Sequence, residues 1–242
     1  MVKNILITGV SQGLGLATVE AVLAVGDTVY GVSRRLTPKF QALQAQHPGR
    51  VHFKACDLGQ PTEAVRCVFN DFMDLKTPLH GFVNNAAVAY DDLVTNVQLE
   101  PLAAMYAVNV FTPMLFVRHC IRNMLLHEIR GAIVHVSSIS VHTGYKGLAM
   151  YASTKGALEA FSKNTAREWG ERGVRSNCLV AGFMETNMSA TLSNEARERI
   201  YRRTSLKQAT DIASVAGTIN YLLGDEARSI TGQNIFVDSG TI

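Results

Sequence analysis

Tyr151 and Lys155 lie four residues apart in a stretch whose composition is typical of a helix. Residues at i and i+4 share one helix face, so the phenol and the ammonium can point into the same space. A phenol has an ordinary pKa of about 10, and a nearby cation favours its ionised form. Ser138, thirteen residues before Tyr151, ends an apolar run and adds a hydroxyl donor. These residue types suit the protonation of an oxygen that gains negative charge.

Each of these residues also has a simpler explanation. A tyrosine and a lysine at this spacing occur by chance on many helices as a solvated pair. A serine at the end of a strand often serves only the following turn. The catalytic interpretation therefore depends on whether the chain also has a binding site for a reactive cofactor near these three residues.

A glycine-rich turn, Thr8–Gly15, joins the first predicted strand to the first predicted helix. Glycines at such a junction permit a tight turn and a close approach of the backbone to a pyrophosphate. The N-terminus of the following helix offers N–H groups and a positive dipole end to the phosphates. The spacing is G-x-x-x-G-x-G. The residues predicted to contact a dinucleotide here are Gly9, Ser11, Gln12, Gly13, Leu14 and Gly15.

The end of the second predicted strand indicates which dinucleotide is bound. An Asp or Glu at this place binds the ribose 2′-OH of NAD, whereas an arginine accommodates a 2′-phosphate. The strand ends at Ser33 and Arg34 and carries no carboxylate. Two adjacent arginines, Arg34 and Arg35, can also be plain surface charge. In this position they favour NADP(H) as the cofactor.

Two further strand ends are predicted to contact the adenosine. Asp57 and Leu58 follow the third strand, where a carboxylate can accept a hydrogen bond from the adenine amino group. Capping the next helix is an alternative role for Asp57. Asn85 and Ala86 follow the fourth strand, where small residues let the backbone approach the adenosine.

Short β-branched runs alternate with helical ones along the whole chain, which predicts a parallel sheet with helices on both faces. The fold class is therefore α/β: one doubly wound Rossmann-type domain over residues 1–242, with a seven-stranded, mostly parallel sheet. The predicted strands are Ile5–Thr8, Thr28–Val32, Val51–Lys54, Gly81–Val83, Ala132–Ser137, Arg175–Val180 and Asn234–Val237. The predicted helices are Leu16–Val25, Thr37–Gln46, Thr62–Leu75, Leu102–Leu126, Ala149–Gly170 and Thr210–Leu223.

Residues 184–207 interrupt this alternation with polar, helical sequence after the sixth strand. Ligands of open α/β sheets bind beyond the carboxyl ends of the strands. An insertion that leaves this edge is placed to act as a lid, and the alternative is a plain surface excursion.

Composition excludes several classes of function. A net charge of +3 is too small to indicate nucleic-acid binding. No apolar run approaches the ~20 residues of a membrane helix, and the first strand begins almost at once, so a cytoplasmic protein without a leader is expected. The four cysteines form no C-x-x-C and the seven histidines show no ligand spacing, so no metal site is expected. A basic cluster near residues 197–203 is interpreted as a solvated helix face, with contact to an anionic carrier as the alternative.

Together these motifs resemble the single-domain short-chain dehydrogenase/reductase family, from Asn4 to the segment 231–240. The resemblance implies that Tyr151 is the acid/base and that Ser138 holds the substrate oxygen. It implies that Lys155 binds the nicotinamide ribose and lowers the pKa of Tyr151, and that Asn109 anchors a water in a proton relay. It further implies that Gly182 and Thr186 lie at the nicotinamide. Ala87 and Ala181 depart from the family pattern, which usually has glycine and proline there.

Within the family the chain most resembles the 3-oxoacyl-[acyl-carrier-protein] reductases. This implies an NADPH-dependent carbonyl reductase acting on a 3-oxoacyl thioester of acyl carrier protein or CoA, with Arg130 and Arg172 near the carrier-docking positions. One alternative is an NAD(P)-dependent alcohol dehydrogenase for a small ketone, cyclic alcohol or sugar. Another is a catalytically silent NADP(H)-binding sensor or scaffold.

Two further expectations concern the substrate pocket and the assembly. A homotetramer is expected because the two long helices carry apolar residues on more than one face. The helix residues supporting this are Met105, Phe111, Leu115, Phe161 and Trp169. The substrate pocket is expected to be lined by His142, Tyr145, Met150, Phe183 and Met188.

Overall fold

The computed structural model describes residues 2–186 and 192–241. Within them the chain forms a seven-stranded sheet in the order β3-β2-β1-β4-β5-β6-β7, and every paired strand runs parallel to its neighbour. The fold class expected from the sequence is confirmed. The strands are β1 Asn4–Thr8, β2 Thr28–Ser33, β3 Val51–Ala55, β4 Gly81–Asn84, β5 Ala132–Ser138, β6 Arg175–Ala181 and β7 Asn234–Val237.

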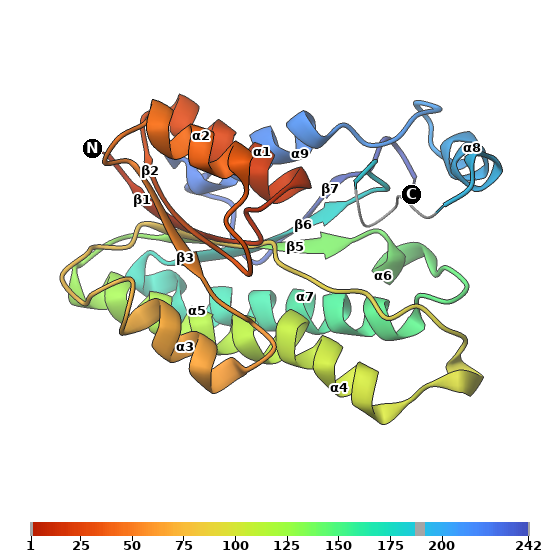
Figure 1. Ribbon diagram of the computed structural model, residues 1–242, viewed down its shortest axis with the longest axis horizontal. Helices are drawn as coiled ribbons and strands as arrows, with labels where there is room; N and C mark the ends of the chain where they lie inside the picture. Colours follow the sequence, from red (N-terminus) through yellow and green to blue (C-terminus); the bar gives the residue numbers. More distant parts are fainter. Residues whose placement is uncertain (1, 187–191, 242) are drawn as a thin grey trace.

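Helices cover both faces of this sheet (Figure 1): α1, α2 and α9 lie on one side, and α3, α4, α5 and α7 on the other. The α-helices are α1 Gly13–Ala24, α2 Pro38–Gln46, α3 Pro61–Phe69, α4 Leu99–Tyr106, α5 Thr112–Leu126, α6 Ser140–Thr143, α7 Ala149–Trp169, α8 Asn194–Arg203 and α9 Ile212–Leu223. The 3₁₀ turns are η1 Val94–Asn96, η3 Gly170–Arg172 and η5 Asp225–Ala227, and η2 Ala107–Phe111 is a π-helix.

The strands are apolar because both of their faces are buried. Ile5, Leu6 and Ile7 of β1 are each at most 1% exposed, although their side chains alternate between the two faces. Ile5 and Ile7 join the core under α1 and α9, and Leu6 joins the core under α3 and α5. Such continuous apolar runs are expected of parallel strands between two helical layers.

Two helices differ from the sequence prediction. The third helix ends at Phe69 and not at Leu75, because Asp74 accepts hydrogen bonds from the amides of Lys76 and Thr77 and organises a turn. The long helix predicted from Leu102 is interrupted by η2. Pro113 has no N–H to donate to the carbonyl four residues before it, which favours the wider π turn at this point.

The helical stretch Leu99–Leu126 corrects the expectation that no apolar run approaches a membrane helix in length. Its 28 residues include an 18-residue window of mean hydropathy 1.3, which would suffice to cross a bilayer by length and composition. The core helix of a soluble protein passes the same test. Here Met105, Phe116 and Met124 are at most 1% exposed, and the latter two pack in the core under the sheet.

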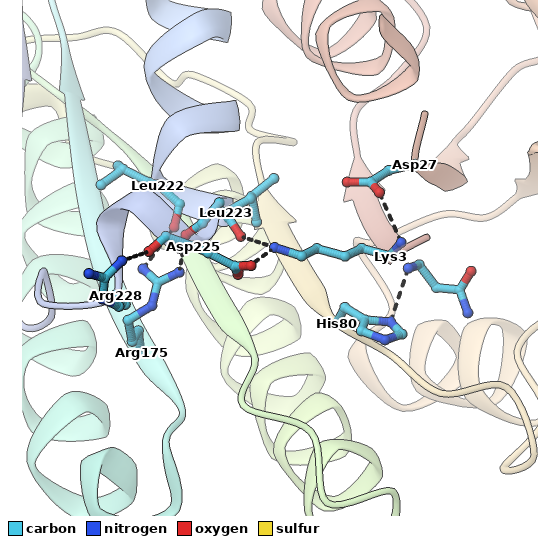
Figure 2. Close-up of polar contacts among 10 residues, drawn as sticks. Lys3, Asp27, His80, Arg175, Leu222, Leu223, Asp225 and Arg228 are labelled. Carbon is cyan, nitrogen blue, oxygen red and sulfur yellow. Dashed lines mark hydrogen bonds and ion pairs between the residues drawn. The ribbon is translucent and has the colours of Figure 1, made fainter. Parts of the chain in front are cut away.

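The amino ends of the strands are tied together by charged groups (Figure 2). Lys3 donates from its ammonium to Asp225 at 2.8 Å and from its backbone amide to Asp27 at 2.9 Å. Arg175 donates to the carbonyls of Leu222 and Gly224, at 2.8 and 3.1 Å, where α9 ends. Cations at the C-terminus of a helix satisfy its last carbonyls and complement its dipole.

The described part of the segment 184–207 contains α8. Ser193 caps this helix by accepting a hydrogen bond from the amide of Ala196 at 3.3 Å. Glu185, before the gap in the described residues, accepts hydrogen bonds from Tyr201 and Arg197 of α8. The polar sequence therefore forms the helix that was expected, and residues 187–191 of the predicted lid lie outside the described residues.

Candidate active site

The glycine-rich turn after β1 packs directly against the end of β4. Gly9 has a φ of +76°, and a Cβ on it would lie 2.8 Å from the Cα of Ala86. A Cβ on Gly15 would lie 2.0 Å from the carbonyl oxygen of Gly9. Asn85 closes the contact by donating its side-chain amide to the carbonyl of Thr8 at 2.9 Å. Only glycine fits these two turn positions, so the backbone forms an open cradle at the start of α1.

A cavity of about 560 Å³ opens beside this cradle. It brings together the predicted cofactor residues Gly9, Ser11, Gln12, Gly13, Leu14, Gly15, Ser33, Arg34, Asp57, Leu58, Asn85, Ala86, Tyr151, Lys155 and Thr186. Its lining also includes Arg35, named beside Arg34 in the sequence analysis, and Met184 of the predicted lid. Thr37, Cys56, Val88, Val108 and Val136 line it as well, and the sequence did not single these residues out. The cradle, the uncapped helix start and the two arginines fit a dinucleotide with its phosphates at α1.

The end of β2 presents two exposed arginines to the cavity, Arg34 and Arg35. Ser33 is 7% exposed, and its hydroxyl donates to the carbonyl of Arg35 at 2.9 Å. Contact between Ser33 and a phosphate would require that hydroxyl to rotate away from Arg35. The positive charge at this end of the cavity therefore comes from a pair of arginines and not from Arg34 alone.

Asp57 serves its own turn. Its carboxylate accepts a hydrogen bond from the amide of Gly59 at 2.9 Å, and α3 is N-capped by Gln60. The alternative prediction, that Asp57 caps α3, is therefore wrong. Asp57 and Leu58 both line the cavity, and the carbonyl of Leu58 is held by the buried hydroxyl of Thr112 at 2.7 Å.

Lys155 is 2% exposed and donates from its ammonium to the carbonyl of Val136 on β5 at 2.8 Å. Burial lowers the pKa of Lys155 to about 8, because removal from water disfavours the charged form. The ammonium lies 5.6 Å from the centre of the Tyr151 ring. The two side chains of α7 therefore share one space, as their spacing predicted.

The pKa of Tyr151 moves in the direction opposite to the one expected. Burial raises it, and the carboxylate of Asp91 adds to the same effect. The phenol is therefore protonated at neutral pH, as an unshifted phenol also is, and the raised pKa makes it a weaker acid in the protein without cofactor.

Ser138 ends β5, beside Ala181 of β6. Its hydroxyl oxygen accepts hydrogen bonds from the amide and the hydroxyl of Ser140, at 3.2 and 3.0 Å. Both contacts use lone pairs of the Ser138 oxygen. The proton of Ser138 can therefore be directed toward another oxygen, such as that of a substrate.

Asn109 lies in η2, the kind of local π-helix that is frequent at functional sites. It is 1% exposed, and its amide group exchanges two hydrogen bonds with the backbone of Val88, at 2.9 and 2.8 Å. It also donates to the hydroxyl of Thr154 on α7 at 3.1 Å. The side chain thus fastens the loop after β4 to the helix that carries Tyr151. The water relay implied for Asn109 stays a prediction.

The remaining positions named from the family resemblance divide into two groups. Thr186 lines the cavity, whereas Gly182 is a packing position, because a Cβ on it would lie 2.3 Å from the Thr210 hydroxyl and 2.6 Å from the Cα of Asp238. Ala87 lines the cavity and Ala181 is 4% exposed. Neither alanine has a positive φ. Alanine is therefore accommodated without strain at both departures from the family pattern.

Several predicted substrate residues have other contacts in the structure. His142 contacts Glu159 at 3.0 Å, and Met150 is 6% exposed. Phe183 packs near Tyr201, with 6.1 Å between ring centres. Met188 lies outside the described residues. Glu159 was missed by the sequence analysis, although its place four residues after Lys155 puts it on the same helix face.

The fold and the site define a dinucleotide-dependent oxidoreductase. A sequence model of a protein family matches residues 9–241. The family is of the short-chain dehydrogenase/reductase type, and its description is "Enoyl-(Acyl carrier protein) reductase". The chain therefore belongs to the short-chain dehydrogenase/reductase family, and it is an oxidoreductase of that family.

Two curated relatives align over nearly the full chain. Carbonyl reductase [NADPH] 2 of Sus scrofa is 31% identical over 97% of this chain and 94% of its own length. The 3-oxoacyl-[acyl-carrier-protein] reductase FabG of Aquifex aeolicus is 29% identical over 98% and 96%. A solved structure, 4-hydroxyisoleucine dehydrogenase complexed with NADH, superposes with a TM-score of 0.90 over 99% of this chain and 98% of that one. Its 23% identity shows the shared fold.

Proposed function

We propose that this protein is an NADPH-dependent carbonyl reductase that converts a ketone to a secondary alcohol. The observation that supports this most directly is the presence of Tyr151 and Lys155 in the same cavity as the glycine cradle. The cofactor, when bound, supplies the hydride to the carbonyl carbon. NADPH, the ketone and one proton give NADP⁺ and the alcohol.

The chain's own residues deliver the proton. Tyr151, which is protonated at neutral pH, donates to the oxygen on which negative charge develops. Ser138 directs its hydroxyl proton to the same oxygen and stabilises that charge. Lys155 remains a cation beside the phenol at neutral pH, where it favours the tyrosinate left after transfer.

We assign the preference for NADPH to the end of β2. Arg34 and Arg35 can pair with a 2′-phosphate there, and no carboxylate of β2 opposes it. NADPH should be favoured over NADH by about 2–3 kcal/mol, the range for hydrogen bonds to charged groups. Changing Ser33→Asp with Arg34→Ile should reverse the order in a comparison of kcat/KM. Equal use of both cofactors by the unchanged protein would refute the assignment.

The 3-oxoacyl thioester is the proposed substrate class, and the placement of the arginines restricts how a carrier could present it. The side-chain stem of Arg130 packs over Gly173, which follows Arg172, so the two arginines are neighbours. They precede β5 and β6 and thus lie at the amino ends of these strands, while the cavity lies at the carboxyl ends. The seven residues of β5 span roughly 20 Å. Docking there therefore favours delivery into the cavity of a neighbouring copy.

A homotetramer would supply such neighbours. Phe111 is 50% exposed on the long helical stretch, which supports an interface at this place. Met105 is 1% exposed and therefore contributes to the internal core and not to an interface. Light scattering of the purified protein should give four chains, and a monomer at micromolar concentration would contradict the assembly.

The segment 184–207 is proposed as a lid within a single domain over residues 1–242. Met184 and Thr186 line the cavity, and Glu185 connects this part of the chain to α8 through Arg197 and Tyr201.

A cytoplasmic location remains an expectation.

The reaction is tested by following NADPH oxidation with an N-acetylcysteamine 3-oxoacyl thioester beside simple ketones, with Tyr151→Phe as the matched control. Turnover of the thioester by the unchanged protein supports the proposal. Turnover of ketones alone moves the substrate to the small-ketone alternative. Binding of NADPH without turnover across the panel would overturn the reductase and leave the silent cofactor-binding alternative.

A further inference from the structure

Glu159 is a buried carboxylate on α7, the helix that also carries the proposed catalytic residues Tyr151 and Lys155. It lies on α7, four residues after Lys155 and eight after Tyr151, so the three side chains share one face of the helix. It is 8% exposed. A carboxylate in such a place is stable only when donors satisfy its oxygens.

Three polar side chains from three other elements meet this carboxylate. Ser137 of β5 donates to one oxygen at 2.5 Å, and Asn234 of β7 donates to the other at 2.7 Å. His142 of α6 lies 3.0 Å from the second oxygen and 3.1 Å from the first. Ser137 and Asn234 thus satisfy the two oxygens of Glu159, and His142 adds a third hydrogen bond when its ring carries the proton on Nε2.

Two of these donors flank Ser138 along the chain. Ser137 precedes it directly, and His142 follows it by four residues. Helix α6 has only four residues, which is too short to be stable without tertiary contacts. It begins at Ser140, the residue that fixes the Ser138 hydroxyl by two hydrogen bonds. Whatever immobilises α6 therefore also orients Ser138.

His142 supplies this anchor from two sides. Its ring nitrogen bonds to Glu159, and its ring packs edge-on against Phe236 of β7, with 4.8 Å between ring centres. Glu159 in turn belongs to the helix that carries Tyr151. The chain of contacts from α7 through His142 and Ser140 to Ser138 thus links the two hydroxyl groups that must meet on one substrate oxygen.

We propose that Glu159 is a positioning residue for the reduction, acting through His142 and Ser137 to hold Ser138 in reach of the oxygen that Tyr151 protonates. This inference rests on the proposed carbonyl reduction. A misplacement of about 1 Å by a change behind the reacting groups can cost up to ~10²-fold in rate. The expected signature is a fall in kcat with NADPH affinity unchanged.

The test uses His142, because its side chain is 26% exposed and its replacement should not unfold the protein. His142→Leu removes the donor, and His142→Gln keeps an N–H at a similar distance from the backbone. We expect His142→Leu to lower kcat about 10-fold and His142→Gln to stay within about 3-fold of the unchanged protein. Circular dichroism melting and NADPH fluorescence titration should show both variants folded and cofactor-competent.

A double-mutant cycle with Ser138→Ala separates positioning from a general structural effect. If Glu159 and His142 act through Ser138, then His142→Leu should cost less than about 2-fold once Ser138 is already alanine. Glu159→Gln should follow the pattern of His142→Leu: it should lower kcat in the unchanged protein and cost less than about 2-fold when Ser138 is already alanine. A 10-fold cost of His142→Leu in the Ser138→Ala background would overturn the inference while leaving the reductase intact. An unchanged kcat for Ser138→Ala alone would instead overturn the assigned role of Ser138 in the reaction.

Discussion

The two ends of the sheet hold cations in different ways. At the amino end, Lys3 pairs with the exposed carboxylate of Asp225, and Arg175 satisfies the last carbonyls of α9 (Figure 2). At the carboxyl end, Lys155 is buried and bonded to the neutral carbonyl of Val136. The first arrangement satisfies the ends of helices and strands, whereas the second holds a charge where it costs stability. Groups shifted by burial inside a cleft are candidates for chemistry, and the difference identifies the carboxyl end as the working end.

The glycine cradle should show the largest effect at the carboxyl end. Gly15→Ala places a Cβ 2.0 Å from the Gly9 carbonyl oxygen, so the turn or the start of α1 must shift. We expect an affinity loss for NADPH of about 2–3 kcal/mol, the upper range for overpacking, measured by fluorescence titration. Gly217→Ala, inside α9, where a Cβ meets no atom within 4 Å and φ is not positive, is the control for adding a methyl group to a helical glycine. Equal NADPH affinity in the two variants would contradict the cradle.

Lys155→Met should increase the stability of the protein without cofactor while removing its activity. The folded protein holds the ammonium with its pKa lowered to about 8, so the unfolded chain binds more protons between that pH and the ordinary lysine pKa. Burial of Lys155 therefore costs stability below about pH 8, and the cost disappears as pH rises toward 10.5. We expect a gain of on the order of 1–2 kcal/mol in the free energy of unfolding at pH 7, after the lost Val136 bond is counted.

Chemical denaturation at pH 7 and at pH 10 measures this effect. The gain from Lys155→Met should be smaller at pH 10 than at pH 7. At pH 10 the unchanged folded protein buries a neutral amine and no longer a charged one. A loss of stability at pH 7 would show that the lysine supports the fold of the carboxyl end as the cations of the amino end do.

Lys3→Met should show the smallest effect. The partner carboxylate of Asp225 is 88% exposed, and pairs of this kind contribute between 0 and about 1 kcal/mol. Thermal melting should shift slightly at low salt and not at high salt, and kcat should stay unchanged. Asp225→Asn is the matched variant, and a fall in kcat with either change would show that the two ends of the sheet are coupled.

Much of the fold and of the carboxyl-end site was predictable from local sequence. The β-branched runs predicted β1 through β7 to within two residues at each end, because strands buried on both faces need apolar side chains throughout. The glycine spacing predicted the cradle, and the i, i+4 rule placed Tyr151 beside Lys155. Each of these features depends on neighbours along the chain.

Features that depend on burial and on distant partners were not predictable in the same way. The pKa of Tyr151 is set by how deeply α7 is covered and by Asp91 from the β4 loop, so its direction was wrong in the sequence analysis. Asn109 contacts Val88, and Glu159 meets polar side chains from three separate elements. The sequence could have flagged Glu159 only as a carboxylate on the catalytic face of a helix.

Tyr151→Phe tests the central claim most directly, because it removes one oxygen from the site and leaves the cradle unchanged. Single-turnover mixing of the NADPH-bound protein with a ketone substrate measures hydride transfer, and a fluorescence titration measures NADPH affinity in the same preparation. We predict a rate at least about 10²-fold lower, the low end for general acid catalysis, with NADPH affinity within about 2-fold. A rate close to that of the unchanged protein would show that Tyr151 is not the proton donor.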